Sequence, residues 1–272
     1  MKVLALDTSN RPLSVALLED ESVLASVTLT VHQKHAEYLL PVIEDLMAKS
    51  EVKPADLDRV VVAEGPGSYT GIRIGVTTAK TLADTLNIEL VGVSSLRALA
   101  LNSQREGGLV WPIFDARNNN VFTGLYRMEK GVPVSVIEDQ HVDFDEFMAK
   151  VVALDEPTIV VGDGQNFADR LDTHFELLTG FDNLPQVAKL GMLGEQLAPV
   201  ADITSFVPNY LRLTQAEADW RKQHPEEDAG SYVEKNLKFG TIIYSSNRND
   251  KSVVNCWILK IIRSKFGIPC TF

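Results

Sequence analysis

Cysteine is scarce in this sequence, with two residues, Cys256 and Cys270, both near the end of the 272-residue chain. Two thiols exclude a disulfide scaffold and a metal cage of four cysteines. No apolar run reaches the roughly 20 residues that a membrane helix needs, and the N-terminus turns polar at Asp7, too early for the apolar core of a signal peptide. We therefore expect a soluble, cytoplasmic protein that makes no contact with a membrane.

Basic residues are also few, since 26 lysines and arginines stand against 37 acidic residues and leave a net charge of −11. That charge disfavours a protein that holds nucleic acid with its whole surface. The charge is uneven, because residues 236–272 carry +5 and the rest of the chain therefore carries −16. Either this tail is an appendage that docks on RNA or on an acidic partner, or, as we prefer, it is a read-through or frameshifted terminus outside the fold.

What the sequence does contain is one pattern of strands and helices used twice. The first copy has expected strands at 3–7, 13–18, 23–30, 59–63 and 88–93 and helices at 35–47, 68–86 and 95–101; the second has strands at 109–115, 121–128, 132–137 and 158–161, a helix at 144–154 and another opened by the turn 162–164. Asp7 and Asp115 each end the first strand of a copy. The repeat predicts a duplicated α/β fold, and two unrelated α/β runs are the alternative.

This repeat sets the expected domain boundaries. We place an N-terminal subdomain at 1–105, a C-terminal subdomain at 106–235 and the basic tail at 236–272. The last helix of the C-terminal subdomain is able to pack back on the first subdomain.

A glycine-rich stretch, EGPGSYTGIRIG, runs from Glu64 to Gly75 and joins an expected strand to an expected helix. Ser68 stands where an N-cap would begin that helix, and the N–H groups of such a turn are able to hold an anion. The glycine spacing matches neither the dinucleotide-binding pattern nor a P-loop. Gly71 and Gly75 stand four apart and would let another segment approach the helix closely. Close packing is therefore favoured over phosphate binding.

Three stretches, MKVLALDTSN, GPGSYTGIRIGVTTAKTLA and VGVSSLRALA, resemble the bacterial TsaB (YeaZ) family of the tRNA N6-threonylcarbamoyladenosine (t6A) pathway, as does LTQAEADWRKQHP near residue 220. The resemblance covers residues 1–235. It implies the duplicated actin-like ATPase fold, of the ribonuclease H-like kind. It also implies pairing with the homologous catalytic subunit TsaD, or with a second copy, and work with the ATPase TsaE, so that tRNA is met only through the complex.

The resemblance also implies that this chain is not the catalyst. In TsaD the segment that matches 91–99 carries a His-x-x-x-His pair that holds a metal, and Ser95 and Leu99 stand at those positions here. Leucine cannot ligate a metal, and neutral serine is a poor ligand for a transition metal. We therefore expect no cofactor and no metal on this chain, with ATP and metal on the partner subunits.

Several weaker motifs leave alternatives open. Asp7, Thr8 and Ser9, with Gly65 and Gly67, resemble the first phosphate loop of actin-like ATPases, but the following Asn-Arg-Pro lacks the glycine that lets phosphate approach the backbone, so we interpret the loop as vestigial. The alternative function is a small-molecule kinase that uses this loop and 162–164. A glycoprotease-type metallopeptidase is disfavoured, because no metal pair or activated nucleophile is evident.

Two further groups of polar residues are ambiguous. His32 and His35 have a spacing that suits a metal, but without a third ligand they are better read as capping or solvated histidines. Asp115-Ala-Arg117 is either a salt-bridged turn or an interface feature, and the sequence does not decide between them.

The first two long helices are predicted to bind a partner, because their apolar bands are wider than one sheet-facing stripe. The predicted interface consists of Leu39, Ile43, Met47, Gly71, Ile72, Gly75, Val76, Ala79, Leu82 and Ala83. The alternative is that both helices simply cover the sheet. If the interface is right, a bulky charged residue at Gly75 or Ala79 abolishes co-purification with TsaD and leaves the fold intact.

Overall fold

The computed structural model describes residues 1–30 and 34–212, and Met1–Leu211 form one compact unit. The expectations for His32, for the stretch 213–225 and for the tail 236–272 therefore lie outside the described residues. Among the described helices, none combines the length and the apolar character that a membrane span requires.

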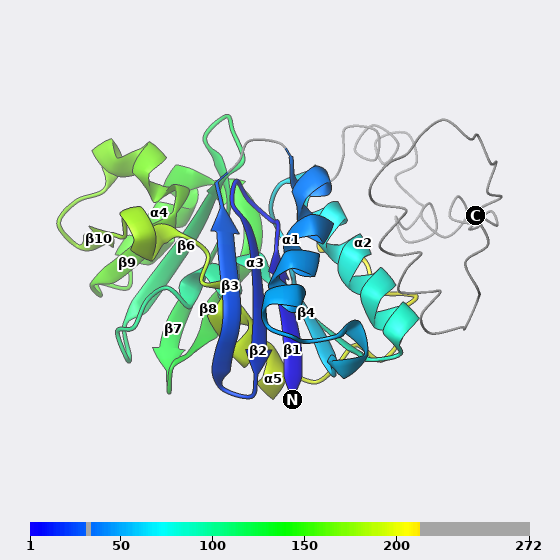
Figure 1. Ribbon diagram of the computed structural model, residues 1–272. Coiled ribbons are helices and arrows are strands. Elements are labelled where there is room, and N and C mark those ends of the chain that lie inside the picture. Colours follow the sequence, from blue (N-terminus) through cyan, green and yellow to red (C-terminus); the bar gives the residue numbers. More distant parts are fainter. Residues whose placement is uncertain (31–33, 213–272) are drawn as a thin grey trace, which may run out of the picture. The chain divides into compact units, whose positions relative to one another are not determined.

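The first half of the unit, here called the first lobe, is built on a five-stranded sheet (Figure 1). Its elements are β1 (Lys2–Asp7), β2 (Leu13–Glu19), β3 (Ser22–Leu29), α1 (His35–Lys49), η1 (Pro54–Asp56), β4 (Arg59–Gly65), α2 (Tyr69–Leu86), β5 (Glu89–Ser94) and α3 (Ser95–Ala100). The strand order is β3-β2-β1-β4-β5, with β1, β2 and β3 antiparallel and β4 and β5 parallel to β1. Strand β1 is covered on both faces, which explains why its sequence is an unbroken apolar run.

The second lobe repeats this plan. Its elements are β6 (Leu109–Asp115), β7 (Asn120–Glu129), β8 (Val132–Asp143), α4 (Phe144–Val152), β9 (Thr158–Gly162), η2 (Asp163–Arg170), β10 (Phe175–Leu177), η3 (Gly180–Asn183) and α5 (Val187–Gln196). The order β10-β9-β6-β7-β8 is that of the first sheet read in reverse, with the antiparallel and parallel pairs in the same places. The predicted duplicated α/β fold is confirmed.

Two of the elements that the sequence predicts in the second lobe differ in the structure. The turn at 162–164 opens the 3-10 helix η2 instead of an α-helix, and the sequence DGQNFADR, which is rich in poor helix formers, accounts for this. Strand β8 continues to Asp143, past the expected end at residue 137, because bulges near Leu125 of β7 restore the pairing beyond that point. The longer strand brings Asp139 into the sheet.

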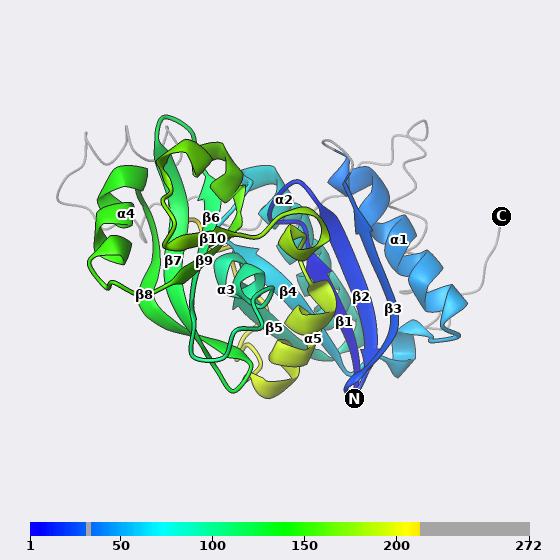
Figure 2. The same ribbon diagram turned by 90° about the vertical axis from the view of Figure 1, so that its left-hand side faces the viewer.

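Helix α5 comes from the second half of the sequence but packs on the first lobe, where it contacts β1, β2 and β4 on the face opposite α1 and α2 (Figure 2). The strand residues that face it alternate along the chain, as in Val3, Ala5 and Val61. Val62, one residue further along β4, faces α2. The first sheet is therefore covered on both sides, and one of the covering helices, α5, comes from the second half of the sequence.

Arg59 fixes α5 to the first sheet. Its buried guanidinium donates hydrogen bonds to the carbonyl oxygens of Gly194 (2.6 Å), Glu195 (3.1 Å) and Leu197 (3.1 Å), and it pairs with the carboxylate of Glu89 (2.5 Å). The last carbonyl groups of a helix lack partners within the helix, so this one side chain satisfies a helix end.

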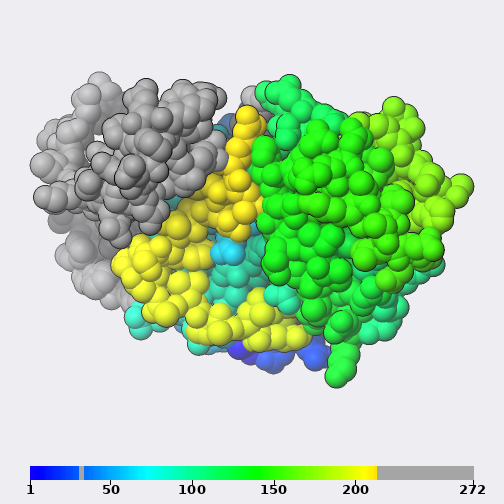
Figure 3. Space-filling model, turned by 180° about the vertical axis from the view of Figure 1, so that it is seen from behind, coloured from blue at the N-terminus to red at the C-terminus, as the bar shows by residue number. Residues whose placement is uncertain are grey.

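The segment after α5 continues across the first lobe, and Figure 3 shows it in yellow beside the green residues of the second lobe. The N–H of Val200 donates to Leu90 O (2.8 Å), and the N–H of Asn209 donates to Glu64 O (2.8 Å). Lys80 of α2 donates its Nζ to Phe206 O (2.6 Å). Residues 199–210 therefore form a strap that joins the edge strand β5 to α2.

The second lobe has a core of its own, centred on Trp111. The indole stacks on Phe144 (5.5 Å between ring centroids) and on Phe147 (5.7 Å), and both rings come from α4. Its Nε1 donates to Thr123 Oγ1 (2.7 Å), so the polar atom of the buried ring is satisfied.

Candidate functional site

The loop that follows β1 is closed on itself. Asp7 is buried, and its Oδ1 accepts hydrogen bonds from the Ser9 N–H (2.9 Å) and from Ser9 Oγ (2.7 Å). Burial raises the pKa of Asp7, while the Ser9 hydrogen bonds and the neighbouring His35 act in the opposite direction. The Asp7 carboxylate therefore holds the conformation of its own loop.

Helix α2 packs directly on this loop. Thr8 Oγ1 donates to Gly71 O (2.8 Å), and the Ser68 N–H donates to Ser9 O (2.7 Å). A Cβ placed at Gly71 would overlap Thr8 O, and one at Gly75 would overlap Thr8 Oγ1. The two glycines thus allow the close approach that the sequence favours. The space next to the loop backbone is taken by α2, so these residues do not fit a nucleotide phosphate.

Ser68 is the N-cap of α2, as predicted, and its side chain accepts from the Gly71 N–H (3.4 Å). The preceding Gly65 has φ +118°, a conformation that favours glycine, and a Cβ there would overlap the carbonyl of Asn209 in the strap. The Gly65 N–H donates to Ser95 Oγ (3.0 Å). Three of the N–H groups of this stretch, those of Gly65, Ser68 and Gly71, are thus used within the chain.

The two positions at which TsaD is expected to hold metal have structural roles. Ser95 is buried and accepts the Gly65 N–H, and buried Leu99 packs against the backbone of Gly162, where a Cβ would lie 2.7 Å from Leu99 Cδ2. Residues 1–30 and 34–212 contain no group of three or more His, Cys, Asp or Glu side chains that could hold a metal ion.

The second loop named for the kinase alternative is also packed. The Gly162 N–H donates to Asn183 Oδ1 (2.6 Å), and the Asn183 Nδ2 returns a bond to Gly162 O (2.8 Å). A Cβ at Gly164 would overlap Val160. The loop at 7–9 is therefore packed against α2, and the loop at 162–164 is packed against Asn183 and Leu99.

All ten residues of the predicted partner interface are buried within the chain. They are Leu39, Ile43, Met47, Gly71, Ile72, Gly75, Val76, Ala79, Leu82 and Ala83. The bands of α1 and α2 are wide because the helices contact each other as well as the sheet. The list of residues is thus corrected: these side chains face the core of the chain, and a partner on these helices would meet other positions.

The expected effect of substitutions at Gly75 and Ala79 is corrected as well. A side chain at Gly75 would enter the space of Thr8, which is fully buried, and Ala79 is itself fully buried. A bulky charged residue at either position would disrupt the packing of α2, so it does not separate binding from folding.

The outer face of α1 and α2 is the surface that these helices offer to a partner, and it is called the outer helical face below. Its exposed residues are Ala36, Glu37, Pro41, Glu44, Asp45, Ala48 and Lys49 on α1 and Tyr69, Thr70, Arg73, Thr77 and Asp84 on α2. Tyr69 is 47% exposed, and its ring stacks on Tyr210 of the strap (4.9 Å) and lies 5.4 Å from the Arg73 guanidinium. Exposed tyrosine and arginine side chains are the types that dominate binding energy at interfaces.

Sequence reasoning missed a group of carboxylates where the two lobes meet. Asp139 of β8 accepts hydrogen bonds from Ser94 Oγ of the first lobe and from Tyr126 OH (2.5 Å). The Glu64 carboxylate lies over Gly92 and makes no hydrogen bond with the described residues. Burial raises the pKa of both carboxyls, and repulsion from Asp139 raises that of Glu64 further. Because these residues are far apart in the sequence, no local sequence pattern predicts that they lie together.

A groove of about 910 Å³ lies at the other end of the first sheet, beside the last turn of α2. Four carboxylates line it, those of Asp58, Asp84, Glu89 and Asp202, and the described residues of its lining include no lysine or arginine. A surface of this charge repels phosphate groups, so the groove is unsuited to nucleic acid.

The turn after β6 is not held by a salt bridge of Arg117. Asp115 Oδ1 accepts the backbone N–H of Arg117 (2.8 Å), and Asp115 Oδ2 accepts from Asn166 Nδ2 (2.9 Å). The exposed guanidinium of Arg117 forms no hydrogen bond or ion pair with a residue of the described ranges. The salt-bridged-turn interpretation of Asp115-Ala-Arg117 is therefore wrong.

Comparison with known proteins gives a consistent result. The family model described as TsaD, tRNA N6-adenosine threonylcarbamoyltransferase, matches residues 22–220. The tRNA threonylcarbamoyladenosine biosynthesis protein TsaB of Bacillus subtilis (strain 168) is 40% identical over 225 residues, which cover 81% of this chain and 98% of that protein. The protein of the same name from Escherichia coli (strain K12) is 35% identical over 135 residues, 48% of this chain and 58% of that protein. The crystal structure of an uncharacterized protein with similarity to peptidase YEAZ from Pseudomonas aeruginosa has a TM-score of 0.69 at 28% identity, and covers 78% of this chain and 99% of its own.

Proposed function

The chain belongs to the TsaB family of tRNA threonylcarbamoyladenosine biosynthesis proteins, and we propose that in this pathway it is the non-catalytic subunit that binds and activates the transferase TsaD. In this proposal TsaD and the ATPase TsaE carry the ATP, the metal and the chemistry. The chain supplies a surface, and tRNA meets it only through the assembled complex.

The observation that carries the proposal is the filled phosphate loop of the first lobe. In an actin-like enzyme, the loop after the first strand needs free space beside its backbone for phosphate. Here α2 occupies that space through Gly71 and Gly75, and Asp7 is engaged by Ser9. A fold that keeps its architecture while its substrate loop is packed is suited to binding a partner.

The outer helical face supports the choice of interface. It joins two helices that lie side by side in the first lobe, and it has an exposed aromatic group and charges of both signs (Figure 1). TsaD is matched by the same family model as this chain, so a TsaD partner would have equivalent helices to place against it. A second copy of the chain would have them too, and a homodimer would therefore compete with the TsaD complex.

An omission experiment tests the proposed role. TsaD, TsaE and the synthase that forms the threonylcarbamoyl adenylate are combined with tRNA, with and without this chain, and t6A is measured by mass spectrometry of the digested tRNA. We expect t6A with the chain and a loss of at least tenfold without it. Formation of t6A at an equal rate without the chain would refute the activating role, and t6A formed by the chain in the absence of TsaD would refute the non-catalytic one.

A matched pair of charge reversals tests the interface. Arg73→Glu changes the outer helical face, whereas Arg105→Glu changes an exposed arginine in the connection between the lobes. Arg73→Glu should weaken TsaD binding at least tenfold in calorimetric titration, because an arginine lost from an interface centre is costly. Arg105→Glu should bind as the unchanged chain does. Equal affinity for both variants would place the interface elsewhere.

A further inference from the structure

The two sheets end in four edge strands within the described residues: β3 and β5 in the first lobe, β10 and β8 in the second. An edge strand has a row of backbone N–H and C=O groups with no neighbouring strand. Proteins therefore cover such edges, keep them short, or place proline and charged residues on them, because an open edge accepts a strand from another chain.

Two of the four edges are covered or short. The strap covers β5, since the Val200 N–H donates to Leu90 O (2.8 Å). Strand β10 is only three residues long. Neither edge offers a long row of free backbone groups to a second chain.

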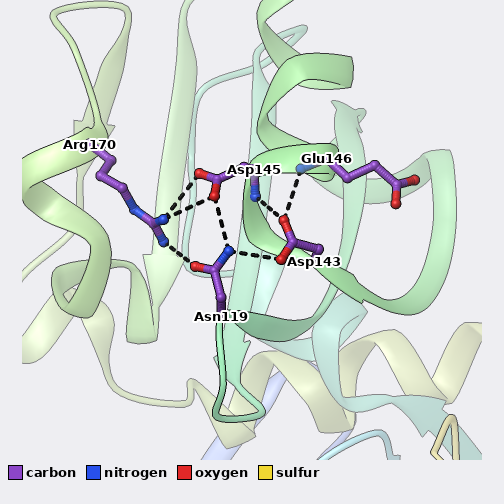
Figure 4. A network of polar contacts seen from close by, with 5 residues as sticks. All are labelled: Asn119, Asp143, Asp145, Glu146 and Arg170. Carbon is purple, nitrogen blue, oxygen red and sulfur yellow. Dashed lines mark hydrogen bonds and ion pairs between the residues drawn. The ribbon is translucent and has the colours of Figure 1, made fainter.

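The third edge, β8, is protected by its residue types. It carries Pro133, which has no N–H to donate, and the exposed, charged Glu138. Its last residue, Asp143, belongs to the network in Figure 4, where its carboxylate accepts from Asn119 Nδ2 (2.8 Å) and from the Asp145 N–H (2.9 Å). Strand addition along β8 is therefore disfavoured.

Strand β3 has neither kind of residue. Its sequence, SVLASVTL, contains no charged residue and no proline. Leu24 is bulged out of the pairing with β2, which protects the start of the strand, but residues 25–29 pair with residues 13–17 in unbroken register. Every second residue of an antiparallel strand directs its N–H and C=O away from its neighbour, and no strand in the described part of the chain accepts those of β3. Residues 25–29 are thus open to a further strand.

A second copy of the same strand, in antiparallel orientation, suits this edge. With Val27 on the two-fold axis, Ala25 would lie opposite the other copy's Leu29, and Ser26 opposite the other copy's Thr28. None of these residues is charged, so no like charges would face each other across the pair. Valine and threonine are also types that favour strands.

The charges at the two ends of β3 favour the same orientation. In the acidic turn before the strand, Glu19 and Asp20 are paired within the chain, whereas exposed Glu21 has no ion pair in the described ranges. The other end of β3 lies where α1 begins (Figure 1), and exposed Lys34 stands there with only a weak, exposed pair to Glu37 (3.4 Å). Antiparallel pairing brings Glu21 of each copy to the end that carries Lys34 of the other, whereas parallel pairing would place the two acidic turns side by side.

We propose that β3 is a dimerisation edge, to which a second copy of this chain adds its own β3 in antiparallel orientation. The two first sheets then form one continuous sheet of ten strands, five from each copy. Because the described part of each copy has one such open edge, the pairing closes at two copies.

This surface differs from the outer helical face. Helix α2 lies over β4, which two strands separate from β3, so the exposed Tyr69 and Arg73 of α2 stay free for TsaD. A dimer formed on the helices would compete with TsaD, but one formed through β3 leaves α2 free. The dimer is thus independent of the function proposed above.

Matched lysine variants of the two long edge strands test the proposal. Ser26→Lys changes an exposed serine of β3, where the lysines of the two copies would be diagonal neighbours on one face of the sheet, and Ser135→Lys makes the same change on β8. The full chain and both variants are compared by sedimentation equilibrium, with circular dichroism as the check of folding. The unchanged chain and Ser135→Lys should form dimers of equal affinity, and Ser26→Lys should raise the dimer Kd at least tenfold with an unchanged spectrum.

A charge exchange tests the orientation. Glu21→Lys and Lys34→Glu should each weaken the dimer, because each places like charges at both ends of the paired strands. The variant that carries both substitutions restores opposite charges and should regain the affinity of the unchanged chain. A double variant no stronger than the single ones would overturn the antiparallel arrangement.

The remaining outcomes each overturn the proposal. A chain that stays monomeric, or a dimer that Ser26→Lys leaves intact, shows that β3 is not the interface. Equal losses in Ser26→Lys and Ser135→Lys would reflect a general effect of added charge. A dimer lost in Arg73→Glu but kept in Ser26→Lys would lie on the outer helical face. A monomeric chain that binds TsaD more weakly as Ser26→Lys would make TsaD the occupant of the edge.

Discussion

The contact between α2 and the first loop gives a prediction that can be worked out in detail. Gly75 faces Thr8, and a Cβ at position 75 would overlap Thr8 Oγ1, while the other near atoms, Val62 Cγ2 (3.6 Å) and Thr8 Cβ (3.7 Å), are at ordinary contact distance. The conflict in Gly75→Ala is therefore with one oxygen atom. Removing that atom by Thr8→Ala should remove the conflict.

The magnitudes follow from this geometry. Gly75→Ala in the unchanged background costs about 1–3 kcal/mol for overpacking a buried site and gains about 0.5–1 kcal/mol from helix propensity, so it should destabilise by about 1–2 kcal/mol. Thr8→Ala alone loses the hydrogen bond to Gly71 O, worth about 0.5–1.5 kcal/mol, and a buried methyl group worth about 0.8 kcal/mol. With Thr8→Ala present, Gly75→Ala should instead stabilise by about 0.5–1 kcal/mol.

The assay is a double-mutant cycle measured by urea unfolding with circular dichroism. The expected coupling between the two positions is about 2 kcal/mol, which corresponds to roughly 4–8 °C in Tm for a domain of this size. Gly71→Ala is the matched control, because a Cβ at position 71 meets the backbone oxygen of Thr8, which no side-chain substitution removes. If Gly75→Ala remains equally destabilising next to Thr8→Ala, or if Thr8→Ala rescues Gly71→Ala as well, the packing account of these glycines is wrong.

Two other substitutions have clear expected outcomes. Arg59→Met leaves the carbonyl groups at the end of α5 without their charged donor and should lower the free energy of unfolding in urea by about 2–4 kcal/mol. The control, Arg127→Met, breaks a more exposed pair with Glu156 and should cost about 1 kcal/mol or less. Equal losses for the two variants would show that Arg59 does not fix α5. Burial and Asp139 raise the pKa of Glu64, so the folded state binds its proton more tightly and stability falls as pH rises through the ordinary value of 4.5. Glu64→Gln should therefore have a higher Tm than the unchanged chain at pH 8 and lose that advantage below pH 4.5, and an advantage that grows on acidification would contradict the assignment.

The parts of the fold that follow from local pattern were predictable from the sequence. Apolar alternation and turn residues give both three-stranded meanders, and Ser68 marks the start of α2 because N-cap chemistry depends on a few neighbouring residues. The 3-10 helix η2 was not predicted, since the turn residues at its start are equally typical of the opening of an ordinary helix.

The candidate site was only partly predictable, because its features depend on contacts between distant residues. The wide apolar bands of α1 and α2 correctly predicted that these helices are buried on more than one side, but not which residues bury them. The two helices bury each other, and the sheet and Thr8 cover the rest. Glu64 and Asp139 approach each other only once both lobes are in place.

The position of α5 and the strap has a consequence for how the chain is made. The second sheet is complete with residues 109–177, whereas the first sheet lacks one of its covers until α5 and residues 199–210 have been synthesised. During translation the second lobe is thus able to close before the first, although its sequence comes later. Until α5 emerges, the apolar face around Val3, Ala5 and Val61 is covered only in part, by α3, and a chain shortened before residue 187 would leave the rest exposed and aggregate. The first lobe therefore becomes native only after α5 and residues 199–210, the last described part of the chain, have been synthesised.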